Sequence, residues 1–158
     1  MGMPMAPSYA NLFMSEVEAN LLKDFKAKTG LEPLVWFRFL DDIIFVWQHG
    51  EENLKKFFEH MQTFAERKGM KTSLKFTFEY GQSVPFLDTT VSLKEGKIVT
   101  DLYCKKTDAH LYLRSDSCHP KNCIKGLAKG EFLRVKRICS TVEDFKKRAL
   151  ELKGFFIK

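Results

Sequence analysis

The sequence predicts an α+β fold in which helices pack against antiparallel β-hairpins. Apolar residues recur at helical spacing in several segments, and runs rich in aromatic and β-branched residues alternate with short turns. The order of these segments groups the strands into hairpins, which is typical of an antiparallel sheet. Hydrophobic residues make up 44% of the 158 residues and include fifteen Phe, enough for a packed core.

The first predicted element is a helix from Ser8 to about Lys28. Pro7 and Ser8 are suitable for its start, and Gly30 is suitable for its end. Its apolar residues recur every three or four positions and form one stripe along the helix: Ala10, Phe13, Val17, Leu21 and Phe25.

A tight β-hairpin is predicted next, from the apolar runs 34–39 and 43–47 with the turn at Asp41–Asp42. A second amphipathic helix then runs from Glu51 to about Lys68, where the Glu51–Lys55 pair has favourable i,i+4 spacing. Its predicted buried face consists of Leu54, Phe57, Phe58, Met61 and Phe64.

Three further strands are predicted before the helical C-terminal part. LKFTFEY (74–80) alternates as a strand does, residues 84–93 begin another strand, and Lys94–Gly96 turns the chain onto residues 97–105. Residues 107–120 have an irregular pattern. Residues 132–139 are predicted to be helical, and a last helix opens at Ser140, where Ser140 and Glu143 have the spacing of a capping box.

The net charge of +6 is unevenly distributed along the chain. Residues 1–96 carry a net charge of −2, whereas residues 97–158 carry a net charge of +8. A basic surface suits contact with nucleic-acid phosphates, although a solvated helical face is the simpler interpretation. No apolar run approaches the roughly 18–20 residues that span a bilayer, and no signal peptide is evident. We expect an intracellular protein with no membrane contact; nucleus and cytoplasm are not distinguished.

The Asp41–Asp42 pair is the most informative polar feature because it lies between runs of Phe, Leu, Ile and Trp. Adjacent carboxylates beside an apolar core repel each other and are costly to desolvate, and a divalent cation removes that cost. Carboxylates are the hard oxygen ligands that Mg²⁺ prefers, and two such ions catalyse phosphoryl transfer in many enzymes. The alternative is a surface turn with two solvated acids.

Several motifs together resemble reverse transcriptases. FLDD within RFLDDIIFVW resembles the aromatic-x-Asp-Asp motif C of that family, and GMPMAPSYANLFM resembles motif B. LKFTFE, VPFLDTTV, TDLYCKKTDAHLYL and SCHPKN resemble the end of the palm, the primer-grip hairpin and the beginning of a helical thumb. The residues of these motifs are most similar to those of Penelope-like retroelements. The resemblance implies a partial polymerase palm over residues 1–93, and a primer-grip hairpin with a basic thumb-like segment over residues 94–158.

The resemblance also implies roles for individual residues. Asp41 would bind both catalytic Mg²⁺ (or Mn²⁺) ions, and Asp42 would support it near the primer end. Phe39 would pack near the primer terminus, and Lys75 would face the leaving pyrophosphate, although an exposed strand lysine is an equal alternative. The turn and helix start beside the nucleotide would be shaped by Gly2, Pro4 and Ser8. The implied partners are an RNA template, a DNA primer and deoxynucleotides.

One part of the family pattern is missing from this sequence. The motif A aspartate, which supplies the second bridging carboxylate, and the fingers would precede motif B, and the chain begins within motif B. We therefore expect a retroelement fragment that does not polymerise alone, which leaves open whether the chain is an enzyme. A non-enzymatic remnant that binds RNA or RNA–DNA duplex through the basic C-terminal segment is one alternative. An unstable product with exposed strand edges is another.

The four cysteines are predicted to be reduced thiols rather than zinc ligands. Cys118-His119-x3-Cys123, with His110, Cys104 or Cys139 nearby, contains enough soft ligands for zinc, but its spacing is looser than that of a zinc ribbon. We expect no zinc site and no disulfide framework.

Overall fold

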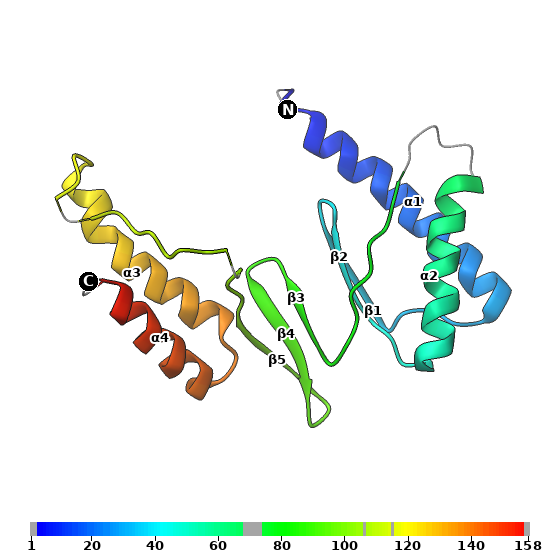
Figure 1. Cartoon of the computed structure of the whole chain (residues 1–158). Coiled ribbons are helices and arrows are strands. Elements are labelled where there is room, and N and C mark those ends of the chain that lie inside the picture. Colours follow the sequence, from blue (N-terminus) through cyan, green and yellow to red (C-terminus); the bar gives the residue numbers. More distant parts are fainter. Residues whose placement is uncertain (1–2, 68–73, 106, 115, 157–158) are drawn as a thin grey trace. The chain divides into compact units, whose positions relative to one another are not determined.

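The computed structural model describes residues 3–67, 74–105, 107–114 and 116–156, with side chains described except at 65–67. The chain divides into two compact units, Met1–Glu79 (unit 1) and Tyr80–Lys158 (unit 2), and each is described by itself. Figure 1 shows helices and an antiparallel sheet in each unit. The predicted α+β class is therefore confirmed. No described helix is long and apolar enough to cross a membrane.

The described part of unit 1 contains two helices and one hairpin, and the sequence predicted all three. Helix α1 spans Ala6–Thr29 and helix α2 spans Gly50–Arg67, with strands β1 (Val35–Phe39) and β2 (Asp42–Val46) between them in the chain. Phe57 of α2 is fully buried at the centre of the core. The other buried members of this cluster come from both predicted helical stripes: Val17, Leu21, Phe25, Met61 and Phe64.

The ends of α1 follow from its sequence. Pro7 lies within the first two helical positions, where its missing N–H is not needed. Gly30 ends the helix in the left-handed region, at φ 71°, and its N–H donates to the Lys26 carbonyl at 2.8 Å. Of the predicted stripe, Ala10 is exposed, so the buried part of the helix begins further along the chain.

The β1–β2 hairpin has the expected strands but a different turn. Phe39 pairs with Asp42, so the two turn residues are Leu40 and Asp41 rather than the predicted Asp41 and Asp42. Leu40 has a φ of 53°, at the first central position, where a two-residue turn usually takes glycine. The prediction was wrong because local rules do not favour leucine in the left-handed region.

Residues 74–80 do not form the predicted strand, since none of them belongs to a described sheet. The alternation is nevertheless real, because Leu74, Phe76 and Phe78 pack against the unit 1 core while Lys75 is exposed. Phe78 stacks on Phe58 with ring centroids 4.0 Å apart. Side-chain packing on α2 therefore holds this segment, and no neighbouring strand pairs with it among the described residues.

Unit 2 contains a three-stranded antiparallel sheet of β3 (Ser83–Phe86), β4 (Thr89–Lys94) and β5 (Lys97–Leu102). The single strand predicted over 84–93 is instead a hairpin. Its turn is Leu87–Asp88, and Leu87 has a φ of 54°. The predicted Lys94–Gly96 turn is confirmed: Glu95 and Gly96 have φ values of 50° and 74°, a pair that a type I′ turn requires.

Two helices complete unit 2, α3 (Lys121–Ile138) and α4 (Val142–Phe156), which lie side by side (Figure 1). Helix α3 begins eleven residues before the predicted 132–139 segment. Its first ten residues contain Gly126 and Gly130, which weakened the helical signal, and packing against α4 and β5 outweighs that low propensity. The predicted irregular structure holds for the described parts of 107–120.

The cap of α4 is Thr141, not Ser140. The Thr141 Oγ accepts the Asp144 N–H at 3.1 Å and donates to the Asp144 carboxylate at 2.7 Å. The Ser140 Oγ instead accepts the Thr100 N–H at 2.9 Å, and the Ser140 N–H donates to the Thr100 carbonyl. The helix start is therefore tied to the sheet by one residue and capped by the next.

Candidate functional site

Asp41 and Asp42 lie at the tip of the β1–β2 hairpin, and both are exposed. Asp41 is the second turn residue, and Asp42 is the first residue of β2, opposite Phe39. The described part of the chain supplies no hydrogen bond or ion pair to either carboxylate that would occupy its oxygens. Two adjacent, accessible carboxylates can offer oxygen ligands to a hard divalent cation.

The base of the hairpin is held by aromatic packing on α2. Trp36 and Phe45, a cross-strand pair, stack with ring centroids 5.3 Å apart, and Phe45 contacts Phe57 edge-on at 5.5 Å. Trp47, which directly follows β2 at the open end of the hairpin, stacks on Phe57 with ring centroids 5.2 Å apart. Because these rings surround a fully buried side chain, the acidic tip projects from a well-packed base.

Arg38 of β1 joins the acidic turn to α1. Its Nε lies 2.7 Å from Glu18 Oε1, and the two side chains are only 11% and 14% exposed. Its guanidinium also donates to the Asn11 side chain at 2.8 Å and to the Leu40 carbonyl at 2.9 Å. One side chain therefore holds helix α1 and the residue before Asp41 together. Sequence reasoning missed this role; a lone arginine within the apolar run 34–39 was the available signal.

Of the other predicted site residues that the structure describes, all are exposed and only Phe39 adjoins the acidic tip. Phe39 is 55% exposed beside Asp42. Pro4 and Ser8 are exposed at the start of α1, and Lys75 is exposed in the segment after α2. Gly2 lies outside the described residues. The structure thus brings together only Phe39, Asp41 and Asp42 of the predicted set.

The metal-binding capacity of the tip is limited to its two carboxylates. Within the described ranges, no group of three or more His, Cys, Asp or Glu side chains is arranged to hold a metal ion. The four cysteines have free thiols, with Cys118 and Cys123 exposed. Burial raises the pKa of the Cys104 and Cys139 thiols, which keeps them protonated at neutral pH. The expectation of no zinc site stays a prediction.

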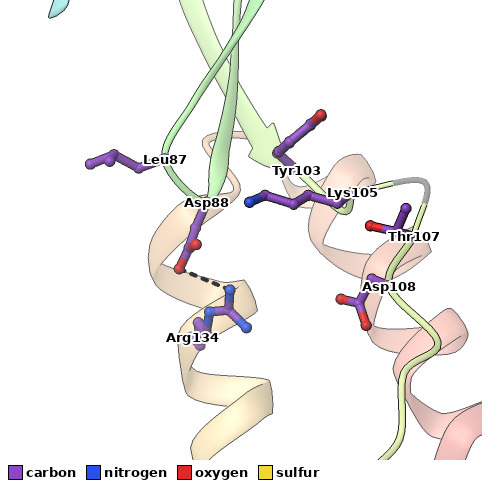
Figure 2. A pocket seen from close by; sticks show the side chains of 7 residues that line it. All are labelled: Leu87, Asp88, Tyr103, Lys105, Thr107, Asp108 and Arg134. Atoms are coloured by element: carbon purple, nitrogen blue, oxygen red, sulfur yellow. Dashed lines mark hydrogen bonds and ion pairs between the residues drawn. The ribbon is translucent and has the colours of Figure 1, made fainter. Parts of the chain in front are cut away.

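Unit 2 has a polar cavity of about 310 Å³ between the β3–β4 turn and helix α3. Figure 2 shows the Asp88 carboxylate accepting a hydrogen bond from Arg134 at 2.8 Å, with Lys105 and Asp108 nearby on the cavity wall. Burial lowers the pKa of Arg134, but the hydrogen bonds and negative charges of Asp88 and Glu131 together outweigh this effect and raise the pKa overall. Asp88 is therefore a turn residue and a hydrogen-bond acceptor.

A second ion pair ties the sheet of unit 2 to α4. Arg148 donates to both carboxylate oxygens of Asp101, at 2.6 and 3.0 Å, and the side chains are 22% and 24% exposed. Burial raises the pKa of Asp101, but the hydrogen bonds from Arg148 and the Leu102 N–H outweigh it and lower the pKa overall. The pairs at Asp88 and Asp101 together fix the sheet against both helices.

Comparison with known proteins gives two family matches. Residues 1–91 match the family described as reverse transcriptase (RNA-dependent DNA polymerase), and residues 111–158 match the family described as animal helix-turn-helix domain. No curated protein and no solved structure matches the chain. The first match includes α1, the acidic hairpin and α2, and it covers more than half of the 158 residues. The chain therefore belongs to the reverse transcriptase family.

Proposed function

We propose that the chain is part of the polymerase core of a retroelement reverse transcriptase of the Penelope-like type. In this proposal residues 1–93 belong to the palm and begin within motif B. Residues 94–158 form the primer-grip hairpin and the beginning of the thumb. The observation that carries the proposal is the accessible Asp41–Asp42 pair on a hairpin braced against α1, within the segment that matches the reverse transcriptase family.

The carboxylates of the acidic tip are the type of ligand that a divalent cation prefers. Two carboxylates supply only part of the ligands that such a cation needs. Asp41 and Asp42 supply hard oxygen donors that suit Mg²⁺ or Mn²⁺. When bound, such ions would neutralise charge that develops during nucleotidyl transfer. The chain's own residues would contribute the position of the carboxylates, because Arg38 and the aromatic base fix the turn. Phe39 would offer an apolar surface to the primer terminus.

A metal-binding measurement tests this assignment directly. Free Mn²⁺ is followed by electron paramagnetic resonance during titration of the full chain, and Asp41→Asn and Asp42→Asn are compared with Asp116→Asn. Asp116 is a suitable control because it is exposed and pairs with Arg114 in unit 2. We expect the first two variants to lose one bound ion that the control keeps. Equal Mn²⁺ binding by all three variants would show that the acidic tip does not bind the ion.

We further propose that the 158-residue chain alone does not extend a primer. A two-metal site needs more carboxylates than the acidic tip supplies, and among the described residues no group of three or more His, Cys, Asp or Glu side chains is arranged to hold a metal ion. The measurement is primer extension on an RNA template with Mg²⁺ or Mn²⁺ and deoxynucleotides. Template-directed incorporation that disappears in Asp41→Ala would overturn this proposal.

A second candidate function is nucleic-acid binding without catalysis, carried by unit 2. It is supported by the helix-turn-helix match over residues 111–158 and by the net charge of +8 over residues 97–158. Binding of RNA or RNA–DNA duplex would then depend steeply on salt, because contacts to phosphates release counterions. Duplex binding that is independent of salt concentration, or absent, would argue against it.

A further inference from the structure

The basic charge of the helical pair in unit 2 is concentrated on one helix. Helix α3 contains four lysines, two arginines and one glutamate, a net charge of +5. Helix α4 contains three lysines and one arginine against three acidic residues, a net charge of +1. The net charge therefore distinguishes two helices that both belong to the helix-turn-helix match.

The α3 lysines share one side of the helix. At about 100° per residue, Lys121, Lys125, Lys129 and Lys136 fall within a sector of about 80°. All four are exposed. The one acidic residue of α3, Glu131, lies outside this sector and pairs with Arg134 at 3.3 Å. We refer to these four lysines as the α3 lysine stripe; none of them takes part in the ion pairs given for the described residues.

Two glycines of α3 lie outside the lysine stripe and have no packing explanation. A Cβ added at Gly126 or Gly130 would meet nothing within 4 Å, so neither glycine makes room for a neighbour. Glycine in a helix interior costs about 1 kcal/mol relative to alanine. At about 100° per residue, Gly126 and Gly130 lie roughly 60° and 100° beyond the edge of the lysine sector, on a part of the helix surface that is separate from the stripe.

We infer that the α3 lysine stripe, not α4, is the surface of unit 2 that contacts the phosphate backbone of a nucleic-acid duplex. The inference rests on the proposed nucleic-acid-binding function and specifies its contact surface. Lys121 and Lys136 are about 22 Å apart along the helix axis, about two-thirds of a duplex turn of 34–36 Å. Lysines contact phosphates as point charges, so this surface binds without reading sequence.

The test compares two matched triple variants of the full chain. Lys121→Gln/Lys125→Gln/Lys129→Gln removes three charges from α3, and Lys146→Gln/Lys147→Gln/Lys153→Gln removes three exposed charges from α4. The probe is a fluorescein-labelled 20-base-pair RNA–DNA hybrid, with a second hybrid of shuffled sequence. Fluorescence anisotropy gives the affinity between 50 and 200 mM salt.

We expect the α3 variant to reduce the slope of log affinity against log salt by about 2.7, since each lost phosphate contact contributes about 0.9. The affinity ratio between 50 and 200 mM salt then shrinks roughly 40-fold. The α4 variant and the shuffled hybrid are expected to behave like the wild type and original hybrid. An α4 variant with an equal or greater loss overturns the inference but leaves nucleic-acid binding intact. Absence of wild-type binding overturns both.

A measurement on the unmodified chain keeps the inference testable if a variant misfolds. Amine acetylation followed by mass spectrometry reports the accessibility of each lysine with and without the hybrid. We expect the hybrid to protect Lys121, Lys125 and Lys129 several-fold more than Lys146, Lys147 and Lys153. The opposite order of protection would assign the contact to α4 and refute the inference.

Discussion

Replacement of Arg38 by methionine tests whether the acidic turn depends on a buried charge. The ion pair with Glu18 is only 11% and 14% exposed, so water cannot readily replace the lost partner. Removing one member of a buried pair costs about 3–5 kcal/mol because it leaves the other charge uncompensated. The remaining exposure reduces this cost, whereas the lost bonds to Asn11 and Leu40 add about 0.5–1.5 kcal/mol each. We therefore expect Arg38→Met to destabilise unit 1 by about 3–4 kcal/mol.

The assay is urea unfolding followed by tryptophan emission. Both tryptophans of the chain, Trp36 and Trp47, lie in unit 1, so their emission reports its unfolding without a contribution from unit 2. Lys55→Met is the matched control, because the Lys55–Glu51 pair is also close, at 2.8 Å, but its side chains are 61% and 60% exposed. The control is expected to cost less than about 0.5 kcal/mol.

Two further variants separate charge from packing. Arg38→Lys keeps the charge but lacks the planar guanidinium that reaches Glu18, Asn11 and Leu40 from one position, so it is expected to restore less than half of the loss. Arg38→Met combined with Glu18→Gln removes the uncompensated carboxylate and should be more stable than Arg38→Met alone. If Arg38→Met costs no more than the exposed control, Arg38 does not hold the turn against α1, and the reasoning is refuted.

Three predictions concern unit 2, each measured by circular dichroism melting. Asp101→Asn should cost about 1.5–3 kcal/mol by breaking the charged bonds to Arg148. Because folding lowers the pKa of Asp101, its contribution is complete above the unfolded pKa of about 3.9 and is lost as the pH falls through the folded value. The wild type should therefore lose its advantage over this variant on acidification; an unchanged difference would refute the assignment. Thr141→Ala should lower the free energy of unfolding by about 1 kcal/mol through loss of the α4 cap. An unchanged free energy of unfolding would indicate that Ser140 caps α4. Gly130→Ala should stabilise α3 by about 0.5–1 kcal/mol, and destabilisation would reveal a packing role for the glycine.

The sequence predicted the elements whose side-chain period matches their environment. Both helices of unit 1 and the β1–β2 strands follow from apolar spacing, and Phe57 and Leu21 are buried as the stripes require. The segment 74–80 shows the limit of such patterns. Alternation reports which side chains face a core, but it does not report whether a second strand is present to accept the backbone hydrogen bonds.

The first part of α3 and the role of Arg38 were not predicted because both depend on contacts between residues far apart in the chain. Residues 121–131 carry two glycines and little apolar stripe, and they are helical because Val135 and the contacts with α4 and β5 anchor the same helix further along. Arg38 was missed for a related reason. Its partners Asn11 and Glu18 lie far before it in the chain, and no local pattern joins residues that meet only through the packing of α1 on the hairpin.

The two Leu-Asp turns explain why only one of the aspartates is a good candidate metal ligand. Phe39-Leu40-Asp41 and Phe86-Leu87-Asp88 have the same residues in the same hairpin geometry, with leucine at φ 53° and 54°. Leucine in this region costs roughly 1–2 kcal/mol, so in each hairpin packing must hold an unfavourable turn in place. In unit 2 the Asp88 carboxylate is neutralised by Arg134. In unit 1 the arginine binds the Leu40 carbonyl and lies against Glu18 instead, so no described arginine neutralises the Asp41 carboxylate. The Phe-Leu-Asp motif alone therefore does not decide whether the turn aspartate is paired or accessible; the position of the nearest arginine decides it.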